Sequence, residues 1–453
     1  MHMKFFGKVL FVSAIMAFVS SMTYAQSNKW REIHKVKKKE TVFGIAREYG
    51  ISIEELKKAN PEMEAPDYQL KKGTYIFIPF PAPVTENPVI AAPPVPQVNG
   101  ITNRPVRLGV MLPLHDVNGD GRRMVEYYRG VLMACDSLKK EGVSISVHTW
   151  NMAEDADVGH ILADPDAAQM DVILGPLYSA QMAEMSDFVE KHDIKLVVPF
   201  SINAPQLLTN QHIFQVYQSA TALNNAAISR FVSQFSDHHI VIVDCGDSTS
   251  TKGAFTSGLR RQLETDGMSY SLTSLKSTET NFMKAFSRTQ SNVVVLNTGR
   301  SQELSVAFAK LDNLTMNNPS VLVTLYGYSE WLGYTSTQTE HFYKYGVYIP
   351  TPYYLNPLSP QSARFQTKYR WNFHQDMMNA AQRFAVAGFD HTMFFVKGLR
   401  KQGKSFVGEK GSVSYQALQS PLQFERMGVG GLQNRTLLLV HYTSDHRVEI
   451  LNK

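Results

Sequence analysis

From Val106 onward the chain alternates short apolar runs with amphipathic segments, and this alternation limits the possible folds more than any other feature. Val106–Leu112 reads as a buried strand, Tyr127–Lys140 as a helix and Val143–His148 as the next strand. Similar strands are predicted at Leu196–Phe200 and Ile240–Asp244. Near-continuous apolar strands separated by helices are typical of parallel sheets covered on both faces. The sequence therefore predicts an α/β body.

The length of this body indicates how many cores it contains. Residues 106–453 exceed the roughly 250–300 residues at which a single hydrophobic core stops growing. We therefore expect two lobes with parallel sheets. Cys135 and Cys245 fall in different predicted lobes and read as two buried small hydrophobic residues rather than as a disulfide.

The first 25 residues have the layout of a secretory signal peptide. Lys4 and Lys8 precede an apolar run from Val9 to Val19, and Ala25 ends a small-residue cleavage site. The run has about 11 residues, short of the ~20 that a membrane-spanning helix needs. We therefore expect a protein of the periplasm or cell envelope that is not an integral membrane protein, beginning with a short segment at residues 26–33.

Residues 34–79 predict a small strand–helix–helix–strand module. Thr41 is positioned to cap a helix at Val42–Tyr49, and Ser52 with Glu55 forms a capping box for the following helix. After a longer loop that follows the second helix, the chain forms a short strand that ends at Ile78-Pro79.

This module resembles a LysM domain, through Thr41-Val42, Tyr49-Gly50-Ile51-Ser52, Asn60, Gly73 and Ile78-Pro79. The resemblance implies carbohydrate binding, namely of peptidoglycan through N-acetylglucosamine, in a groove between two loops. Docking of a protein on the same shape is the alternative. The groove residues implied by the resemblance are Glu40, Thr41, Val42, Phe43, Gly44, Asn60, Pro61, Glu62 and Met63.

Residues 80–105 are rich in proline and almost uncharged. Such a composition favours an extended polyproline II conformation at ~3.1 Å per residue. We interpret this stretch as a semi-rigid linker between two independent units.

The body resembles the type 1 periplasmic-binding-protein fold, the group that includes the leucine and branched-chain amino acid binding proteins. The resemblance rests on Arg107 to Pro113, Tyr128-Arg129-Gly130, Val172 to Pro176, Val198 to Ser201 and Gly388-Phe389-Asp390. It implies a cleft between two lobes that close on a ligand. The cleft candidates are Gly175, Leu177, Tyr178, Ser179, Ser201, Asn203, Tyr217, Asp247, Tyr326, Tyr328 and Glu330.

One departure from that family limits the ligand. Amino-acid-binding members hold the ligand ammonium with an acidic residue shortly after the strand that matches Phe214–Tyr217, whereas Gln218–Asn225 contains no acid here. A buried ammonium without a partner costs several kcal/mol. We therefore predict that this chain is not an ordinary α-amino acid receptor unless Asp247 or Glu330 substitutes.

Other signals are weaker. Asp116, Asn118 and Asp120 have the spacing of a calcium loop, but position 12 is Tyr127 instead of a glutamate, so an Asn/Gly/Asp turn is favoured and no metal or cofactor is expected. The charge of 45 − 40 = +5 is too dispersed for nucleic acid binding. The sequence contains neither the catalytic motifs of hydrolases nor a glycine-rich nucleotide-binding loop.

These patterns predict a non-enzymatic bacterial envelope protein. We interpret the LysM-like module as the peptidoglycan anchor and the body as a protein-interaction or regulatory module in cell-wall maintenance, with cell-wall synthesis proteins as partners. The first alternative is a peptidoglycan-tethered receptor for a small periplasmic solute, for transport or sensing. A glycan hydrolase with an unrecognised acid pair is the minor alternative.

Overall fold

The computed structural model describes residues 32–38, 40–64, 68–79, 100–201 and 203–451. The chain folds as two compact units that divide between residues 94 and 95. The signal peptide predicted at residues 1–25 and residues 80–99 of the predicted linker lie outside the described residues.

The small unit has the predicted strand–helix–helix–strand order, which confirms this part of the fold class. Its two strands pair antiparallel, with Lys35 opposite Tyr75. The apolar faces of both helices pack with the second strand in one small core that includes Ile45, Leu56 and Ile76. The elements are β1 (Glu32–Lys35), α2 (Val42–Tyr49), α3 (Ile53–Ala59), the 3-10 turn η1 (Pro61–Glu64) and β2 (Tyr75–Ile78).

The predicted helix caps are present in this unit. The Thr41 hydroxyl accepts a hydrogen bond from the Gly44 amide at 3.0 Å, and Gly50 ends α2 in the left-handed conformation with φ of 66°. Ser52 and Glu55 form the reciprocal capping box of α3, with bonds of 2.8 and 3.0 Å.

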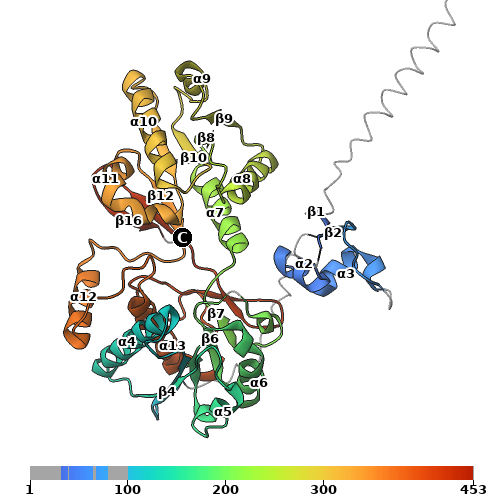
Figure 1. Ribbon diagram of the computed structural model, residues 1–453, viewed down its shortest axis with the longest axis vertical. Helices are drawn as coiled ribbons and strands as arrows, with labels where there is room; N and C mark the ends of the chain where they lie inside the picture. Colours follow the sequence, from blue (N-terminus) through green and yellow to red (C-terminus); the bar gives the residue numbers. More distant parts are fainter. Residues whose placement is uncertain (1–31, 39, 65–67, 80–99, 202, 452–453) are drawn as a thin grey trace, which may run out of the picture. The chain divides into compact units, whose positions relative to one another are not determined.

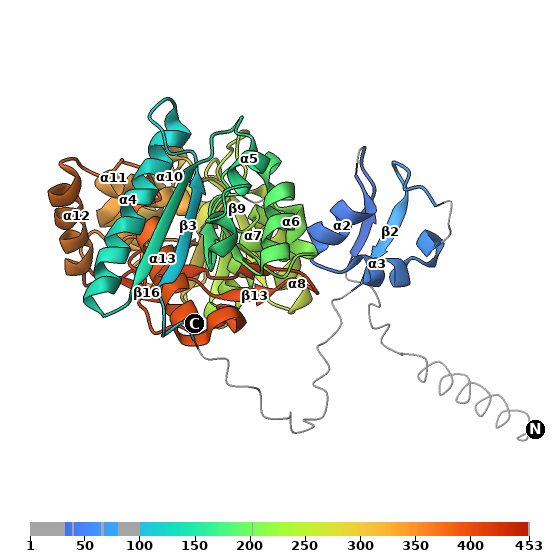
Figure 2. The same ribbon diagram turned by 90° about the horizontal axis from the view of Figure 1, so that it is seen from below.

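The large unit consists of two lobes, each built on a mostly parallel sheet (Figure 1, Figure 2). In the described part of the chain, the strand order is β13-β14-β7-β6-β5-β3-β4 in lobe one and β16-β15-β12-β11-β10-β8-β9 in lobe two. The antiparallel pairs are β13–β14, β12–β15 and β15–β16. These two sheets confirm the predicted α/β fold with parallel sheets.

Lobe one contains β3 (Val106–Leu112), β4 (Ile145–Asn151), β5 (Val172–Leu174), β6 (Lys195–Val198), β7 (Ile213–Gln215), β13 (Phe424–Arg426) and β14 (Leu432–Asn434), with helices α4 (Gly119–Lys140), α5 (Val158–Leu162), α6 (Met182–His192) and α13 (Phe384–Gln402). Lobe two contains β8 (His239–Asp244), β9 (Tyr270–Ser274), β10 (Asn292–Leu296), β11 (Val323–Tyr326), β12 (Tyr348–Thr351), β15 (Leu438–Tyr442) and β16 (Val448–Leu451), with helices α7 (Ala220–Gln234), α8 (Gly253–Thr265), α9 (Glu279–Met283), α10 (Ser301–Asn317) and α11 (Thr335–Lys344).

Both faces of the lobe-one sheet are buried, as the apolar strands predict. Val110 of β3 packs in a core with residues of α4 and α13, whereas the adjacent Met111 packs in a second core with residues of α6. Because side chains alternate across a strand, a sheet buried on both sides needs apolar residues at nearly every position.

The chain crosses between the lobes three times: after β7, between β12 and α13, and between β14 and β15. The second crossing carries α12 (Pro360–Phe373), whose Phe365 and Tyr369 pack against α4 and α13. Side chains tie the crossings together: the Gln218 side-chain amide donates to the Thr436 carbonyl at 2.8 Å, and the Tyr217 hydroxyl donates to Gln382.

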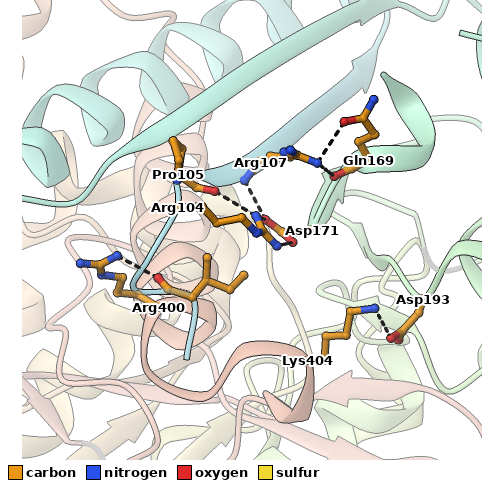
Figure 3. Close-up of polar contacts among 9 residues, drawn as sticks. Arg104, Pro105, Arg107, Gln169, Asp171, Asp193, Arg400 and Lys404 are labelled. Atoms are coloured by element: carbon orange, nitrogen blue, oxygen red, sulfur yellow. Dashed lines mark hydrogen bonds and ion pairs between the residues drawn. The ribbon is translucent and has the colours of Figure 1, made fainter. Parts of the chain in front are cut away.

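Residues 100–105 pack with lobe one, although the proline content assigns them to the linker. Ile101 is 9% exposed, and its carbonyl accepts a hydrogen bond from Arg400 at 2.8 Å (Figure 3). Arg104 donates two hydrogen bonds, of 2.7 and 2.6 Å, to the buried Asp171 carboxylate. A two-point contact between an arginine and a carboxylate fixes the orientation of the arginine as well as its distance. Because these contacts hold residues 100–105 on lobe one, the body begins before β3.

The helix predicted from Tyr127 begins eight residues earlier, at Gly119, with Asn118 as its cap. Cys135 and Cys245 are free thiols in different lobes; Cys245 is buried as predicted, whereas Cys135 is only partly buried, and burial raises the pKa of each to about 12.

Candidate functional site

The lobe-one candidates gather at the carboxyl ends of β5 and β6. Gly175 follows β5 with φ of 135°, and a Cβ atom there would lie 2.0 Å from the Met111 carbonyl oxygen. Only glycine fits this position. The chain then turns through Leu177, which is partly buried against the lobe-one core, and Tyr178, whose hydroxyl lies 3.5 Å from Asp120.

Three polar candidates lie together at this edge. The hydroxyl oxygens of Ser179 and Ser201 are 3.4 Å apart, and the Ser201 hydroxyl accepts a hydrogen bond from the Asn203 amide at 3.1 Å. Ser179 and Asn203 are exposed. The carboxyl ends of parallel strands share one edge of a sheet, which explains why residues that follow two neighbouring strands lie together here. The group offers short neutral donors and acceptors to a ligand.

An aromatic cluster lies beside these residues, and sequence reasoning included only Tyr217 of it. The Phe200 ring contacts the rings of Tyr127, Tyr217 and Phe384 edge to face, with centroids 5.3, 5.6 and 5.6 Å away. Burial raises the pKa of Tyr217, whose hydroxyl is hydrogen-bonded to Gln382. The position of Phe200 two residues after β6 was the available signal.

In lobe two, Asp247 is bonded to residues of its own loop and of the loop after β10. Its carboxylate accepts hydrogen bonds from the Thr249 amide and hydroxyl at 2.9 and 2.7 Å and from the Thr298 hydroxyl at 2.8 Å. These bonds hold the pKa of Asp247 below its ordinary value. Arg300 lies 3.6 Å away, and the Asp247 side chain is only 1% exposed. Its charge is therefore balanced locally.

Glu330 is also paired within lobe two. Lys252 donates a hydrogen bond to its carboxylate, and the same ammonium lies 4.8 Å from the centre of the Tyr328 ring. The Lys252 side chain is 16% exposed. Sequence reasoning missed Lys252, because nothing local links it to a residue 78 positions later.

The tyrosine candidates of lobe two contribute to its core. Tyr326 is fully buried, packs against Phe231 and donates its hydroxyl proton to the Ala227 carbonyl at 3.0 Å. Tyr328 is 6% exposed and donates to the Leu296 carbonyl at 2.6 Å. Both hydroxyls form hydrogen bonds inside lobe two. These two tyrosines therefore do not join Ser179, Ser201 and Asn203 of lobe one in a polar site.

The residues implied for the LysM groove divide into structural and exposed ones. Asn60 is fully buried: its side-chain amide donates to the carbonyls of Leu56 and Phe77 at 2.8 Å, and its oxygen accepts from the Phe77 amide at 2.7 Å. Met63 is 4% exposed. Asn60 therefore connects α3 to β2, and Met63 belongs to the small core.

The other implied groove residues are accessible at least in part. Pro61, Glu62, Thr41 and Gly44 are exposed, Phe43 is half-buried, and Val42 is half-buried against the core. Glu40 lies 2.8 Å from the Nε2 atom of the buried His34 and accepts from the Lys37 amide at 2.6 Å. These contacts hold the pKa of Glu40 below its ordinary value.

The stretch with calcium-loop spacing forms the start of α4. The Asn118 side chain accepts from the Gly121 amide at 2.8 Å, Asp120 lies 3.0 Å from Arg123, and Asp116 lies 3.7 Å from Arg122. Within the described ranges, no three His, Cys, Asp or Glu side chains are grouped as metal ligands. The same part of the chain contains no helix long and apolar enough to cross a bilayer.

Comparison with known proteins identifies both units. A model of the periplasmic binding protein family matches residues 105–429, and a model of the LysM domain matches residues 34–79. No curated protein sequence matches the chain.

Solved structures similar to the body include two proteins described as parts of ABC transporters. A protein described as a branched-chain amino acid ABC transporter from Rhodospirillum rubrum is 13% identical, with a TM-score of 0.52 over 77% of this chain and 100% of that chain. An ABC transporter substrate-binding protein from Desulfitobacterium hafniense in complex with Leu is 15% identical, with a TM-score of 0.41 over the same shares. At these identities the likeness concerns the fold.

Proposed function

Because the chain belongs to the periplasmic binding protein family, we propose that its two-lobed body is a protein-interaction or regulatory module in cell-wall maintenance, held on peptidoglycan by the LysM domain. Both matched families are binding domains rather than enzymes, and both point to an extracytoplasmic protein. The predicted signal peptide at residues 1–25 agrees with that location.

The pairing of the lobe-two acids carries this proposal. Binding an α-amino acid in a closed cleft requires a carboxylate for the ligand ammonium. Asp247 is saturated by Thr249 and Thr298, and Glu330 is paired with Lys252. Neither acid is available without breaking contacts of its own lobe, which favours a role other than amino acid reception.

We expect no micromolar binding of any of the twenty common amino acids to the full chain in isothermal titration calorimetry. The reason is the cost of several kcal/mol for a buried ammonium that lacks a free carboxylate. Micromolar binding of even one of these amino acids would refute the interaction role and favour a receptor.

A small-solute receptor is the second candidate, and family membership together with the polar group of Ser179, Ser201 and Asn203 favours it. That group supplies neutral hydrogen bonds, so its ligand would be a solute without an ammonium group. Titration with neutral sugars and with simple carboxylates separates this role from a docking role.

The LysM anchor predicts that the full chain sediments with purified peptidoglycan sacculi and that a chain lacking residues 26–80 does not. Phe43→Ala, in the proposed groove, should reduce the sedimenting fraction about tenfold through loss of a ring that covers the sugar face. Tyr75→Ala is the matched control, because Tyr75 is a 59% exposed ring on β2 outside the groove. Equal sedimentation of the full and shortened chains would exclude the anchor.

A further inference from the structure

A cavity of about 620 Å³ lies where both lobes meet the third crossing, and none of its lining residues is a cleft candidate. We call it the hinge cavity. Its walls are one face of α7, the loop from Glu409 to Gln423, the crossing Arg435–Leu437 and two residues of α13, Asp390 and Phe394. Its volume lies within the range of small-molecule sites.

The lobe-two wall is a polar helix face. Ala226, Ser229, Arg230 and Ser233 line the cavity, and their spacing places them on one side of α7. The other side carries Ala227, Ile228 and Phe231, which are buried in the lobe-two core. The polar face is therefore available to something other than this lobe.

The lobe-one wall is held in place by a buried carboxylate. Asp390 accepts hydrogen bonds from the amides of Leu418, Gln419 and Ser420 at 2.9, 2.8 and 2.8 Å, and from the Tyr415 hydroxyl. These bonds fix the loop that borders the cavity, so the wall is formed before any ligand arrives.

Several charged groups of the cavity have no internal partner. Within the described chain, Arg230, Lys410 and Glu409 form no side-chain hydrogen bond or ion pair. Glu425 lies 3.4 Å from Arg435, and the buried Thr436 hydroxyl has no hydrogen-bond partner. The cavity thus offers two cations without an ion-pair partner among the described residues, Arg230 and Lys410, and one such carboxylate, Glu409, with Lys410 and Glu409 on its exposed side.

We propose that the hinge cavity binds a small zwitterionic ligand of the short-peptide class. Its carboxylates would lie at Arg230 and Lys410, and its ammonium at Glu409 and Glu425. Since α7 belongs to lobe two and the Glu409–Gln423 loop to lobe one, the ligand would contact both lobes at once. It would thereby bias their relative position, since a ligand shifts an equilibrium by its differential affinity.

The proposed wall attachment suggests one source of such a ligand, and this step rests on that function. The stem peptides of peptidoglycan are short and carry several carboxylates and a free ammonium. The probe is therefore the synthetic tripeptide L-alanyl-γ-D-glutamyl-meso-diaminopimelate, titrated into the full chain by calorimetry. Glutarate, which has the carboxylates without the ammonium, is the comparison ligand.

We expect micromolar binding of the tripeptide and at least tenfold weaker binding of glutarate. Arg230→Gln should weaken tripeptide binding at least tenfold, and Ser229→Tyr, which fills the cavity from an exposed position, should do the same. Arg288→Gln removes the same charge from an exposed lobe-two site outside the cavity and should bind as the unaltered chain does.

The inference is overturned if the tripeptide does not bind at millimolar concentration, or if Arg230→Gln and Ser229→Tyr both bind it normally. Sacculus sedimentation of the same variants keeps this result separate from the proposed function. If the unaltered chain sediments normally but does not bind the tripeptide, the hinge site alone is rejected. Tripeptide binding by a chain that does not sediment rejects the anchor alone.

Discussion

Replacing Gly130 of α4 by alanine is expected to lower the free energy of unfolding of lobe one by about 3 kcal/mol, the upper end of the usual cost of overpacking. A Cβ atom at Gly130 would lie 1.8 Å from the Ala385 carbonyl oxygen of α13. The reciprocal contact is equally close, because a Cβ atom at Gly388 would lie 2.1 Å from the Tyr127 carbonyl oxygen. The two helices must separate to admit either methyl group.

The same helix supplies a matched control. Gly119 lies in the first turn of α4, where the nearest atom to an added Cβ is 4.0 Å away, so Gly119→Ala should leave stability unchanged or slightly higher. The double variant Gly130→Ala, Gly388→Ala should cost less than the sum of the single variants, because one separation of the helices relieves both contacts.

Urea unfolding, with hydrogen exchange of α4 and α13 amides to localise the effect, measures these changes. A loss below about 1 kcal/mol for Gly130→Ala would show that the helices move apart easily. Strict additivity of the two substitutions would show that the two glycines do not share one contact.

Local sequence patterns predicted the helices and strands, whereas contacts between distant residues determine how these elements pack. The caps at Thr41 and Ser52 are formed by residues within three positions of each other, so the sequence displays them directly. Gly130 and Gly388 stand in motifs that the sequence singled out, but their close approach joins helices 258 positions apart. The start of α4 was missed because Asn118 and Asp120 fit a turn as well as a helix cap.

The residues of the candidate site also differ in whether local sequence patterns or distant contacts determine their place. Ser179, Ser201 and Asn203 follow ends of neighbouring parallel strands, so topology alone brings them together. Tyr326 also ends a strand, yet its ring lies in the core, because an aromatic residue in a sequence does not reveal which face it occupies. The Lys252–Glu330 pair joins the start of α8 to the 3-10 turn Ser329–Tyr334 and has no local signature.

Asp390→Asn is expected to destabilise lobe one, and the size of the loss should depend on pH. Each Asp390 oxygen accepts two hydrogen bonds, from Leu418 and Tyr415 on one side and from Gln419 and Ser420 on the other. An asparagine amide nitrogen would face two donors, which leaves buried groups unsatisfied at a cost of about 1–3 kcal/mol each.

The sign of the pH dependence follows from the burial of this carboxyl. Complete burial raises the pKa of Asp390 from 3.8 to about 6, although four hydrogen bonds act in the opposite direction. Between these values the folded protein keeps a proton that the unfolded chain has released, so the wild-type protein loses stability as pH rises through this window. A difference of about 2 in pKa corresponds to about 3 kcal/mol in total.

Asparagine does not titrate, so the stability difference between wild type and Asp390→Asn should shrink by about 2 kcal/mol from pH 4 to pH 7. Urea unfolding at both pH values measures this difference, and Asp155→Asn, at an exposed aspartate, should show no such change. If the difference instead grows with pH, the hydrogen bonds outweigh burial and Asp390 has a lowered pKa. The carboxyl would then stay anionic over the whole range from pH 4 to pH 7, and the wall of the hinge cavity would keep this negative charge throughout that range.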